Sequence, residues 1–132
     1  MKILVDTHAF LWFVQGDRRL HEPVRLAIED PTNDKLVSVA SVWEIAIKEA
    51  VGKLRFPEPL AIFLARELVG FQLHPISLAH AVAVATLPLH HRDPFDRMMA
   101  VQSLQDELPL VSNDKVFNAY GVERFWDDWN SA

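Results

Sequence analysis

Short apolar segments with the character of strands alternate with helical stretches along the whole of this chain. We expect strands at residues 2–5, 35–39, 71–74, 110–112 and 122–125, and helices at 9–14, 23–29, 42–51, 59–68, 78–87, 95–106 and 115–120. This order favours right-handed crossover connections, which produce a parallel sheet covered by helices on both faces. The first two strands are apolar at nearly every position, as strands buried on both faces are. The sequence therefore predicts an α/β fold.

The length and composition fit one globular domain over residues 1–132, because half of the residues are hydrophobic and 23% are charged. The absence of cysteine excludes disulfides, thiolate nucleophiles and zinc–thiolate sites. No apolar run reaches the roughly 20 residues that a membrane helix needs. The first apolar segment meets Asp6 too early for a signal peptide. We expect a cytoplasmic protein without a membrane segment.

The formal net charge of −5 opposes one class of function. A module that only binds nucleic acid normally carries a basic surface, since phosphate contacts dominate its affinity. The same charge weighs less against a metal-dependent nuclease, because bound cations offset the negative charge of a carboxylate site.

Four acidic residues stand where an active site is expected in such a fold. Ligand sites of open α/β sheets form beyond the carboxyl ends of the strands. Asp6 directly follows the first strand, Glu44 lies shortly after the second, and Asp114 follows the strand at 110–112. Asp96 begins the long helix after residue 93. These positions predict that four acids from separate segments converge at one edge of the sheet.

Each acid also has a purely structural explanation. Ser41 and Glu44 have the spacing of a capping box, with Glu44 as the third helical residue. Asp93 is placed to cap a helix that Asp96 then stabilises in its first turn, and Asp114 can cap its own short helix. Asp6 is harder to explain in this way, because a carboxylate at the end of a buried strand needs a partner. The coincidence of all four acids, rather than any one, indicates a site.

The chemistry of such a cluster is that of hard divalent cations. Mg²⁺ and Mn²⁺ prefer carboxylate and water oxygens as ligands. Ions held in this way can activate water and stabilise the leaving oxygen during cleavage of a phosphodiester bond. Several carboxylates in one place repel each other unless a cation is bound. We therefore expect Asp6, Glu44, Asp96 and Asp114 to be metal ligands and catalytic residues.

Other residues near the acids are weaker candidates. Lys48 and Arg97 could contact substrate phosphates, although Lys48 has the spacing of an ordinary helical ion pair with Glu44. The histidines lack zinc-site spacing, so we expect each in a surface, capping or packing role. The tryptophans are expected in the core or an interface. The candidates for supporting the acids or contacting substrate are Thr7, Lys48, Asp93, Arg97 and Ser112.

Four segments, in this order and with this spacing, resemble the VapC toxins, which are PIN-domain members of bacterial type II toxin–antitoxin pairs. The similarity covers nearly the whole chain, and the set of segments is more specific than any single one. The segments are Asp6-Thr7-His8-Ala9-Phe10-Leu11-Trp12, Ser41-Val42-Trp43-Glu44-Ile45-Ala46-Ile47-Lys48, His91-Arg92-Asp93-Pro94-Phe95-Asp96-Arg97 and Leu110-Val111-Ser112-Asn113-Asp114.

The resemblance implies a three-layer α/β/α sandwich around a short, mainly parallel sheet. It also implies an endoribonuclease that depends on Mg²⁺ or Mn²⁺, with an acidic quartet that matches Asp6, Glu44, Asp96 and Asp114. Asp93 is an extra acid beside Asp96, and either of the two could be the principal ligand. The partners implied are an RNA substrate, a cognate antitoxin protein and, in many members, a second copy of the chain.

Two other functions remain open from the sequence. A PIN-like domain can serve as an inactive protein-interaction module, although the complete acidic quartet opposes this alternative. A metal-dependent phosphatase for small substrates would place the acids in a closed pocket rather than in an open groove.

Two surfaces are expected to bind partners. The helix at 78–87 is nearly apolar all round, so we expect part of it to be buried in a homodimer. An arginine or lysine of an antitoxin could pair with Asp6 or Asp96 in place of the cation. Its apolar anchors would contact Phe10, Trp12, Phe56 and Leu60, although core burial is the simpler expectation for Phe10.

Overall fold

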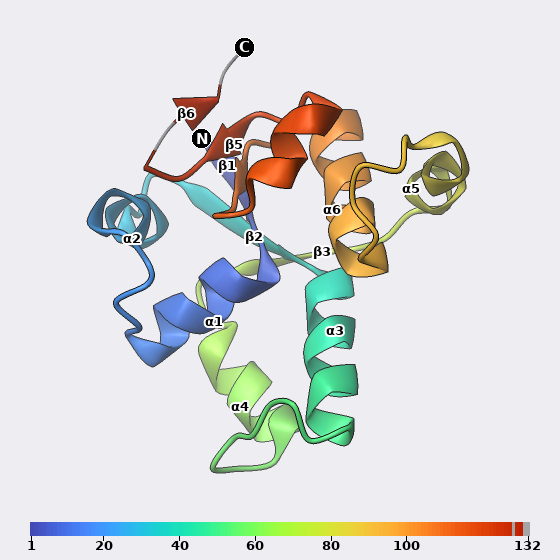
Figure 1. Cartoon of the computed structure of the whole chain (residues 1–132). Helices are drawn as coiled ribbons and strands as arrows, with labels where there is room; N and C mark the ends of the chain where they lie inside the picture. Colours follow the sequence, from blue (N-terminus) through green and yellow to red (C-terminus); the bar gives the residue numbers. More distant parts are fainter. Residues whose placement is uncertain (128, 131–132) are drawn as a thin grey trace.

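A computed structural model of the chain, which describes residues 1–127 and 129–130, contains a six-stranded sheet in the order β3-β2-β1-β4-β5-β6 (Figure 1). Every neighbouring pair from β3 to β5 is parallel, and β6 is antiparallel to β5. The strands are β1 (Lys2–Val5), β2 (Asp34–Ser38), β3 (Gln72–His74), β4 (Leu110–Val111), β5 (Arg124–Phe125) and β6 (Trp129–Asn130).

Helices connect the parallel strands and cover both faces of the sheet. They are α1 (Thr7–Gln15), α2 (Glu22–Glu29), α3 (Val39–Ala50), α4 (Leu60–Glu67), α5 (Leu78–Ala83) and α6 (Pro94–Gln105), with 3-10 helices η1 (Val84–Thr86) and η2 (Lys115–Tyr120). The predicted α/β class with a mainly parallel sheet is confirmed. None of the helices among the described residues is long and apolar enough to span a bilayer.

The side chains of β1 divide between two hydrophobic clusters, one on each face of the sheet. Ile3 and Val5 pack with Phe10 of α1 and with α2 in the first cluster. Leu4 points to the other face and packs with Met99 of α6 in the second. A fully buried side chain of this size contributes roughly 1.5–3 kcal/mol relative to exposure. These clusters, more than the few hydrogen bonds of two-residue strands, hold the three layers together.

Helix α3, which follows the second strand, begins earlier than the sequence predicted. We expected a strand to residue 39 and a helix from residue 42, with Ser41 as its cap. Instead, Ser38 is the N-cap of α3, because its Oγ accepts the N–H of Ala40 at 3.0 Å. Ser41 therefore lies inside the helix and is fully buried. The predicted capping box between Ser41 and Glu44 is wrong, and both side chains are left available for other contacts.

The predicted helix at 78–87 is also shorter than expected. The α-helical part ends at Ala83, and the next three residues form η1. Pro88 accounts for the end of η1 at Thr86, since the residue before a proline, here the extended Leu87, disfavours the helical conformation. The expected strands at 110–112 and 122–125 are likewise reduced to two residues each, β4 and β5.

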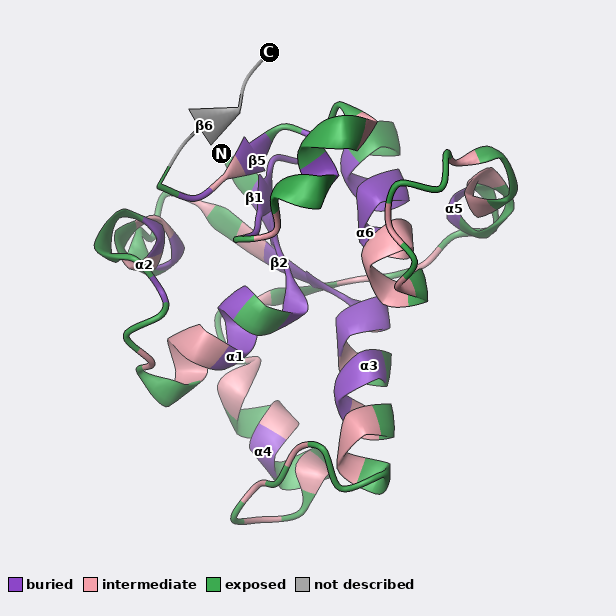
Figure 2. Cartoon of the chain, in the orientation of Figure 1, coloured by how far each residue is buried: buried purple, intermediate pink, exposed green. Residues whose placement is uncertain are grey.

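The topology brings the starts of several helices to one edge of the sheet. β1 lies between β2 and β4, so the carboxyl ends of these three strands are adjacent. Helices α1 and α3 begin directly after β1 and β2, and most residues of their first turns are buried (Figure 2). Figure 1 shows the start of α6 at the same edge.

Candidate active site

Asp6 links the end of β1 to the start of α1. It is the N-cap of α1, where its Oδ1 accepts the N–H of Ala9 at 2.8 Å. The side chain is almost completely buried. Burial raises the pKa of Asp6 above its ordinary value of 3.8, and the nearby Glu44 carboxylate adds to this effect. Hydrogen bonds from the Ser112 hydroxyl and the Ala9 N–H, together with the nearby His8, oppose this rise in the pKa of Asp6.

Glu44 is the second buried acid, and α3 places it beside the start of α1. The Thr7 hydroxyl donates to Glu44 Oε1 at 2.6 Å, and Lys48 Nζ lies 2.6 Å from Oε2. Thr7 Oγ1 also lies 2.9 Å from the buried Ser41 Oγ. The start of α3 at Ser38 allows this arrangement, because it turns Ser41 and Glu44 toward Thr7 along one helix face.

Asp96 lies in the first turn of α6 and is less buried than Asp6 or Glu44. Burial is the largest cause that raises its pKa from 3.8 to about 7, and the neighbouring Asp93 carboxylate is the next. The Asp6 and Glu44 carboxylates raise the pKa of Asp96 as well, whereas His91 lowers it. These mutual effects place Asp6, Glu44 and Asp96 within one electrostatic environment.

Asp93 and Asp114 are caps of the elements that follow them. Asp93 Oδ1 accepts the N–H groups of Phe95 and Asp96 at 2.8 and 3.1 Å. Asp114 Oδ1 accepts the N–H of Val116 at 3.0 Å, which leaves its Oδ2 directed at His91. The capping roles expected for both acids are confirmed. Asp114 nevertheless directs its second carboxylate oxygen, Oδ2, toward the site, because the cap uses only Oδ1.

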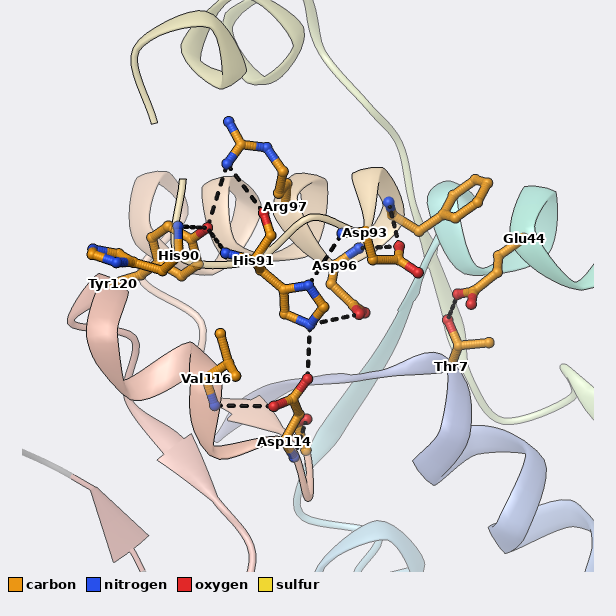
Figure 3. A network of polar contacts seen from close by, with 12 residues as sticks. Thr7, Glu44, His90, His91, Asp93, Asp96, Arg97, Asp114, Val116 and Tyr120 are labelled. Carbon is orange, nitrogen blue, oxygen red and sulfur yellow. Dashed lines mark hydrogen bonds and ion pairs between the residues drawn. The ribbon is translucent and has the colours of Figure 1, made fainter. Parts of the chain in front are cut away.

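His91 joins two of the acids and was not expected there (Figure 3). Its Nε2 lies 2.8 Å from Oδ2 of Asp114 and 3.1 Å from Oδ2 of Asp96. Its Nδ1 accepts the N–H of Asp93 at 3.2 Å, so the neutral ring carries its proton on Nε2. His91 is therefore an N–H donor shared by two carboxylates. The available signal was its position in the 91–97 segment, two residues before the Asp93 cap.

Arg97 makes hydrogen bonds within the protein, and the substrate contact suggested for it by the sequence stays a prediction. Its guanidinium donates to the carbonyls of Val84, Leu87, Pro88 and His91, at 3.0–3.4 Å. The Tyr120 hydroxyl holds the same loop by accepting the N–H groups of His90 and His91. Both side chains thus fix the segment that carries His91 to the acids.

Arg124 of β5 supports the other side of the site and was also missed. Its side chain is fully buried, and its Nη1 donates to the carbonyl of Ser112 at 3.0 Å. Its Nε donates to Asn118 Oδ1 of η2, also at 3.0 Å. Arg124 thereby braces the turn between β4 and η2, which carries Ser112 and Asp114. An arginine within an expected strand was the sequence signal for this role.

The four predicted acids lie at the carboxyl edge of the sheet, where they form two groups. His91 brings Asp96 and Asp114 together, and donor atoms of these three residues lie within 4.8 Å of one another. Asp6 and Glu44 lie deeper, and the Glu44 oxygens face Thr7 and Lys48. These four carboxylates, of which Asp6 and Asp96 have raised pKa values, form a donor set that suits a hard divalent cation, because a bound cation removes their mutual repulsion.

Comparisons with known proteins agree with this fold. A family model described as the PIN domain matches residues 3–123. A segment of 57 residues is 40% identical to Ribonuclease VapC16 of Mycobacterium tuberculosis and covers 43% of this chain but only 40% of that protein. The likeness to VapC-type PIN proteins expected from the sequence is therefore confirmed.

Two solved structures share the architecture at low sequence identity. VapBC2 from Rickettsia felis, bound to a DNA fragment from its promoter, matches with a TM-score of 0.72 and 14% identity, over 98% of this chain and 100% of that one. FitAcB from Neisseria gonorrhoeae matches with a TM-score of 0.66 and 20% identity, over 95% and 96% of the two chains. At these identities the likeness concerns the fold, and it confirms the expected PIN-like α/β/α sandwich.

Proposed function

The chain belongs to the PIN-domain family, and we propose that it is a cytoplasmic endoribonuclease, dependent on Mg²⁺ or Mn²⁺, that serves as the toxin of a type II toxin–antitoxin pair. The observation that carries this proposal is the group of acids at the carboxyl edge of the sheet. Burial and mutual repulsion raise the pKa values of Asp6 and Asp96 there, which leaves both as poorly compensated acids.

The proposed metal ligands are Asp6, Glu44, Asp96 and Asp114. A divalent cation held by them would lower the pKa of bound water and stabilise the charge that develops on the phosphate. Asp93 is less suited than Asp96 to be the principal ligand, because its Oδ1 already accepts two backbone N–H groups. Among the described residues, no backbone N–H donates to the Asp96 carboxylate; its Oδ2 faces His91, and the Asp6 and Glu44 carboxylates add to the burial that raises its pKa.

The surrounding residues would hold these carboxylates in place. Thr7 orients Glu44 through its hydroxyl, and Ser112 does the same for Asp6. The Nε2 proton of His91 keeps Asp96 and Asp114 together in the cation-free protein. Lys48 neutralises Glu44 in that state and can turn to a substrate phosphate, since its side chain is partly exposed.

An RNA strand suits the site better than a small phosphate ester. Asp96 and Asp114 keep about 22% and 39% of their side-chain surface exposed, so the outer part of the site is open to solvent. A phosphatase for small substrates usually encloses them in a pocket. The well-ordered network around the acids also opposes the alternative of an inactive interaction module, which has no need for buried repelling charges.

We include a cognate antitoxin in the proposal. An antitoxin arginine could pair with Asp96 and Asp114, whose exposed oxygens are accessible, better than with the deeply buried Asp6. Phe10 is fully buried and cannot serve as an apolar anchor. Trp12, Phe56 and Leu60 are only partly buried and remain candidates for that contact.

A homodimer is the remaining part of the proposal. Leu78 and Val82 of α5 expose 81% and 62% of their surface, and Trp43 of α3 exposes 59%. An almost wholly apolar hollow lies between these helices and the start of α6, lined in part by Trp43, Ala81 and Phe95. An apolar surface of this kind on neighbouring helices favours burial against a second copy.

The test of the proposed function is cleavage of single-stranded RNA by the purified chain, with and without Mg²⁺ or Mn²⁺. Cleavage should require the cation and should be lost in Asp114→Asn. Asp34→Asn is the matched control, because Asp34 is an exposed acid at the opposite end of the sheet. RNA cleavage that continues at full rate in a chelator would overturn the metal-dependent mechanism.

A further inference from the structure

A second cluster of donor atoms lies at the far end of α6 from the acids. Asp106, the C-cap of α6, faces His74 at the end of β3 and His80 in α5. The Nε2 atoms of His74 and His80 lie 2.7 and 2.8 Å from the same Oδ2 of Asp106. One ligand atom from each residue lies within 4.8 Å of the other two. Three segments of the chain thus converge on one carboxylate oxygen.

The two imidazole rings are held in place before any ligand is bound. His80 is 4% exposed, and its Nδ1 accepts the N–H of Ser77 at 3.0 Å while the Ser77 hydroxyl accepts the N–H of His80. This reciprocal cap directs the His80 Nε2 at Asp106. The His74 side chain is 19% exposed and the Asp106 side chain 32% exposed, so solvent and ions can reach the shared oxygen.

We propose that His74, His80 and Asp106 form a binding site for a late first-row divalent ion such as Zn²⁺. Two imidazole nitrogens and one carboxylate oxygen are the ligands that these ions select, in contrast to the oxygen ligands of Mg²⁺ or Mn²⁺. Water would complete the coordination, because three side chains leave a position open. The inference does not depend on the proposed nuclease activity, since the acids of that site lie elsewhere.

Binding requires one rearrangement, which the structure tolerates. In the ion-free protein the neutral His80 ring carries its proton on Nε2, because Nδ1 accepts from Ser77. Coordination by Nε2 moves that proton to Nδ1 and ends the contact with the Ser77 N–H. Ser77 is exposed at the start of α5, so water can replace the lost acceptor. The exchange replaces three hydrogen bonds, the partly buried one from the Ser77 N–H and the two to Asp106 Oδ2, with three ligand bonds.

Occupation of this site would join three elements at one point. The ion would tie the end of β3 and the helix α5 to the C-terminus of α6, and it would add to the hydrogen bonds of Asp106, Gln102 and Gln105 that now connect them. Because the ion binds only the folded arrangement, it should stabilise the chain by mass action. We therefore expect a Zn²⁺-dependent rise in melting temperature that Mg²⁺ does not reproduce.

The experiment is a titration of the tag-free full chain with Zn²⁺ in excess Mg²⁺, followed by calorimetry, and with Co²⁺, followed by its visible absorption. Wild type should bind one equivalent with a visible Co²⁺ band typical of nitrogen ligands. His74→Ala and Asp106→Asn should weaken binding by roughly 10- to 100-fold or more, since outer-sphere changes alone can have effects of that size. Asp106→Asn keeps an oxygen that accepts a hydrogen bond, so it preserves the fold.

Asp114→Asn is the matched control, because it removes a carboxylate from the proposed nuclease site and leaves the histidine cluster intact. It should bind Zn²⁺ as wild type does. Binding that is lost in Asp114→Asn but retained in His74→Ala would overturn the proposal and assign the ion to the acids. The absence of one-equivalent binding in wild type would also overturn it, and would leave the cluster as a hydrogen-bonded clasp only.

Discussion

The Nε2 atom of His91 lies 2.8 Å from Oδ2 of Asp114, and the proton on Nε2 lies between the carboxylates of Asp114 and Asp96. The same Nε2 atom lies 3.1 Å from Oδ2 of Asp96, so the imidazole N–H is shared by both carboxylates, as a bound cation would be. In the cation-free protein it reduces the repulsion between the two acids. In the proposed cation complex, the same N–H would compete with the cation for the carboxylate oxygens.

His91→Ala should destabilise the cation-free protein by about 1–2 kcal/mol, because it removes a donor shared with ionised groups. Mg²⁺ should then raise the melting temperature of the variant more than that of wild type, since the competing donor is gone. His91→Gln, which retains a donor, is the control. Equal Mg²⁺ shifts in wild type and His91→Ala, measured by thermal unfolding, would show that His91 and the cation do not compete.

Asp6→Asn should abolish RNA cleavage and leave the cation-free protein folded and more stable, by about 1 kcal/mol, because burial penalises the charge of Asp6. The rise in melting temperature on addition of Mg²⁺ should be smaller than in wild type. Asp34→Asn should behave as wild type in both assays. A full Mg²⁺ shift in Asp6→Asn would mean that Asp6 is not a ligand.

The pH dependence of stability should report on Asp96, whose pKa rises from 3.8 to about 7 on folding. The folded state binds the Asp96 proton more tightly than the unfolded state does. The stabilisation of the folded state by protonated Asp96 is therefore present below about pH 4 and is lost as the pH rises to about 7. Asp96→Asn carries no titrating group there. The stability of Asp96→Asn relative to wild type should therefore grow from pH 4 to pH 8 by about 1 kcal/mol or more, which corresponds to several degrees in melting temperature.

The effect of Mg²⁺ should have the opposite trend, because a cation binds the ionised carboxylate. Its stabilisation of wild type should increase from pH 6 to pH 8. Chemical unfolding at each pH measures both quantities. A stability difference between wild type and Asp96→Asn that stays constant from pH 4 to pH 8 would contradict the raised pKa.

Arg124→Met should lower the free energy of unfolding by about 2–4 kcal/mol, because it removes the buried charged donor that binds the Ser112 carbonyl and Asn118 Oδ1. If Arg124 positions the site, the variant should also bind Mg²⁺ more weakly at temperatures where it remains folded. Arg124→Lys should recover part of this affinity. Val122→Ala is the control for a loss of stability alone, because Val122 is a similarly buried apolar residue of the second hydrophobic cluster. An unchanged Mg²⁺ affinity in folded Arg124→Met would contradict the positioning role.

The exposed surface of α5 and α3 should mediate dimerisation. Val82→Glu places a charge on this surface and should give a monomer in light scattering at micromolar concentration, where wild type is a dimer. Val69→Glu is the matched control, because Val69 is 78% exposed and follows α4 rather than α5. A monomeric wild-type chain at that concentration would contradict the proposed interface.

Local patterns in the sequence predicted the parts of the fold that depend on neighbouring residues. Asp6 follows an apolar strand, and Asp93 precedes Pro94 at a helix start, so both positions could be read from a few residues. The start of α3 was misplaced because Ser38 and Ser41 are both good caps. Burial of Ser41 against Thr7, a residue distant in sequence, decided between them.

The contacts made by Arg97, His91 and Arg124 could not be predicted in the same way. Arg97 binds carbonyls of a loop up to 13 residues earlier, and Arg124 binds a carbonyl 12 residues earlier. Nothing in the local sequence distinguishes such an arginine from one that contacts a substrate. The partners of His91 are 5 and 23 residues away, so its role appears only when α6 and η2 are packed together.

The pairing of β1 with β4 joins residues that are synthesised more than a hundred positions apart, with Val5 opposite Val111. A nascent chain that has reached residue 105 already contains Asp6, Glu44 and Asp96, yet lacks Asp114 and the buried Arg124 that supports it. Contacts between such distant segments form slowly, because a long loop must close first. The acids therefore come together only late in synthesis, and a prematurely terminated product would carry three of the four without the frame that aligns them.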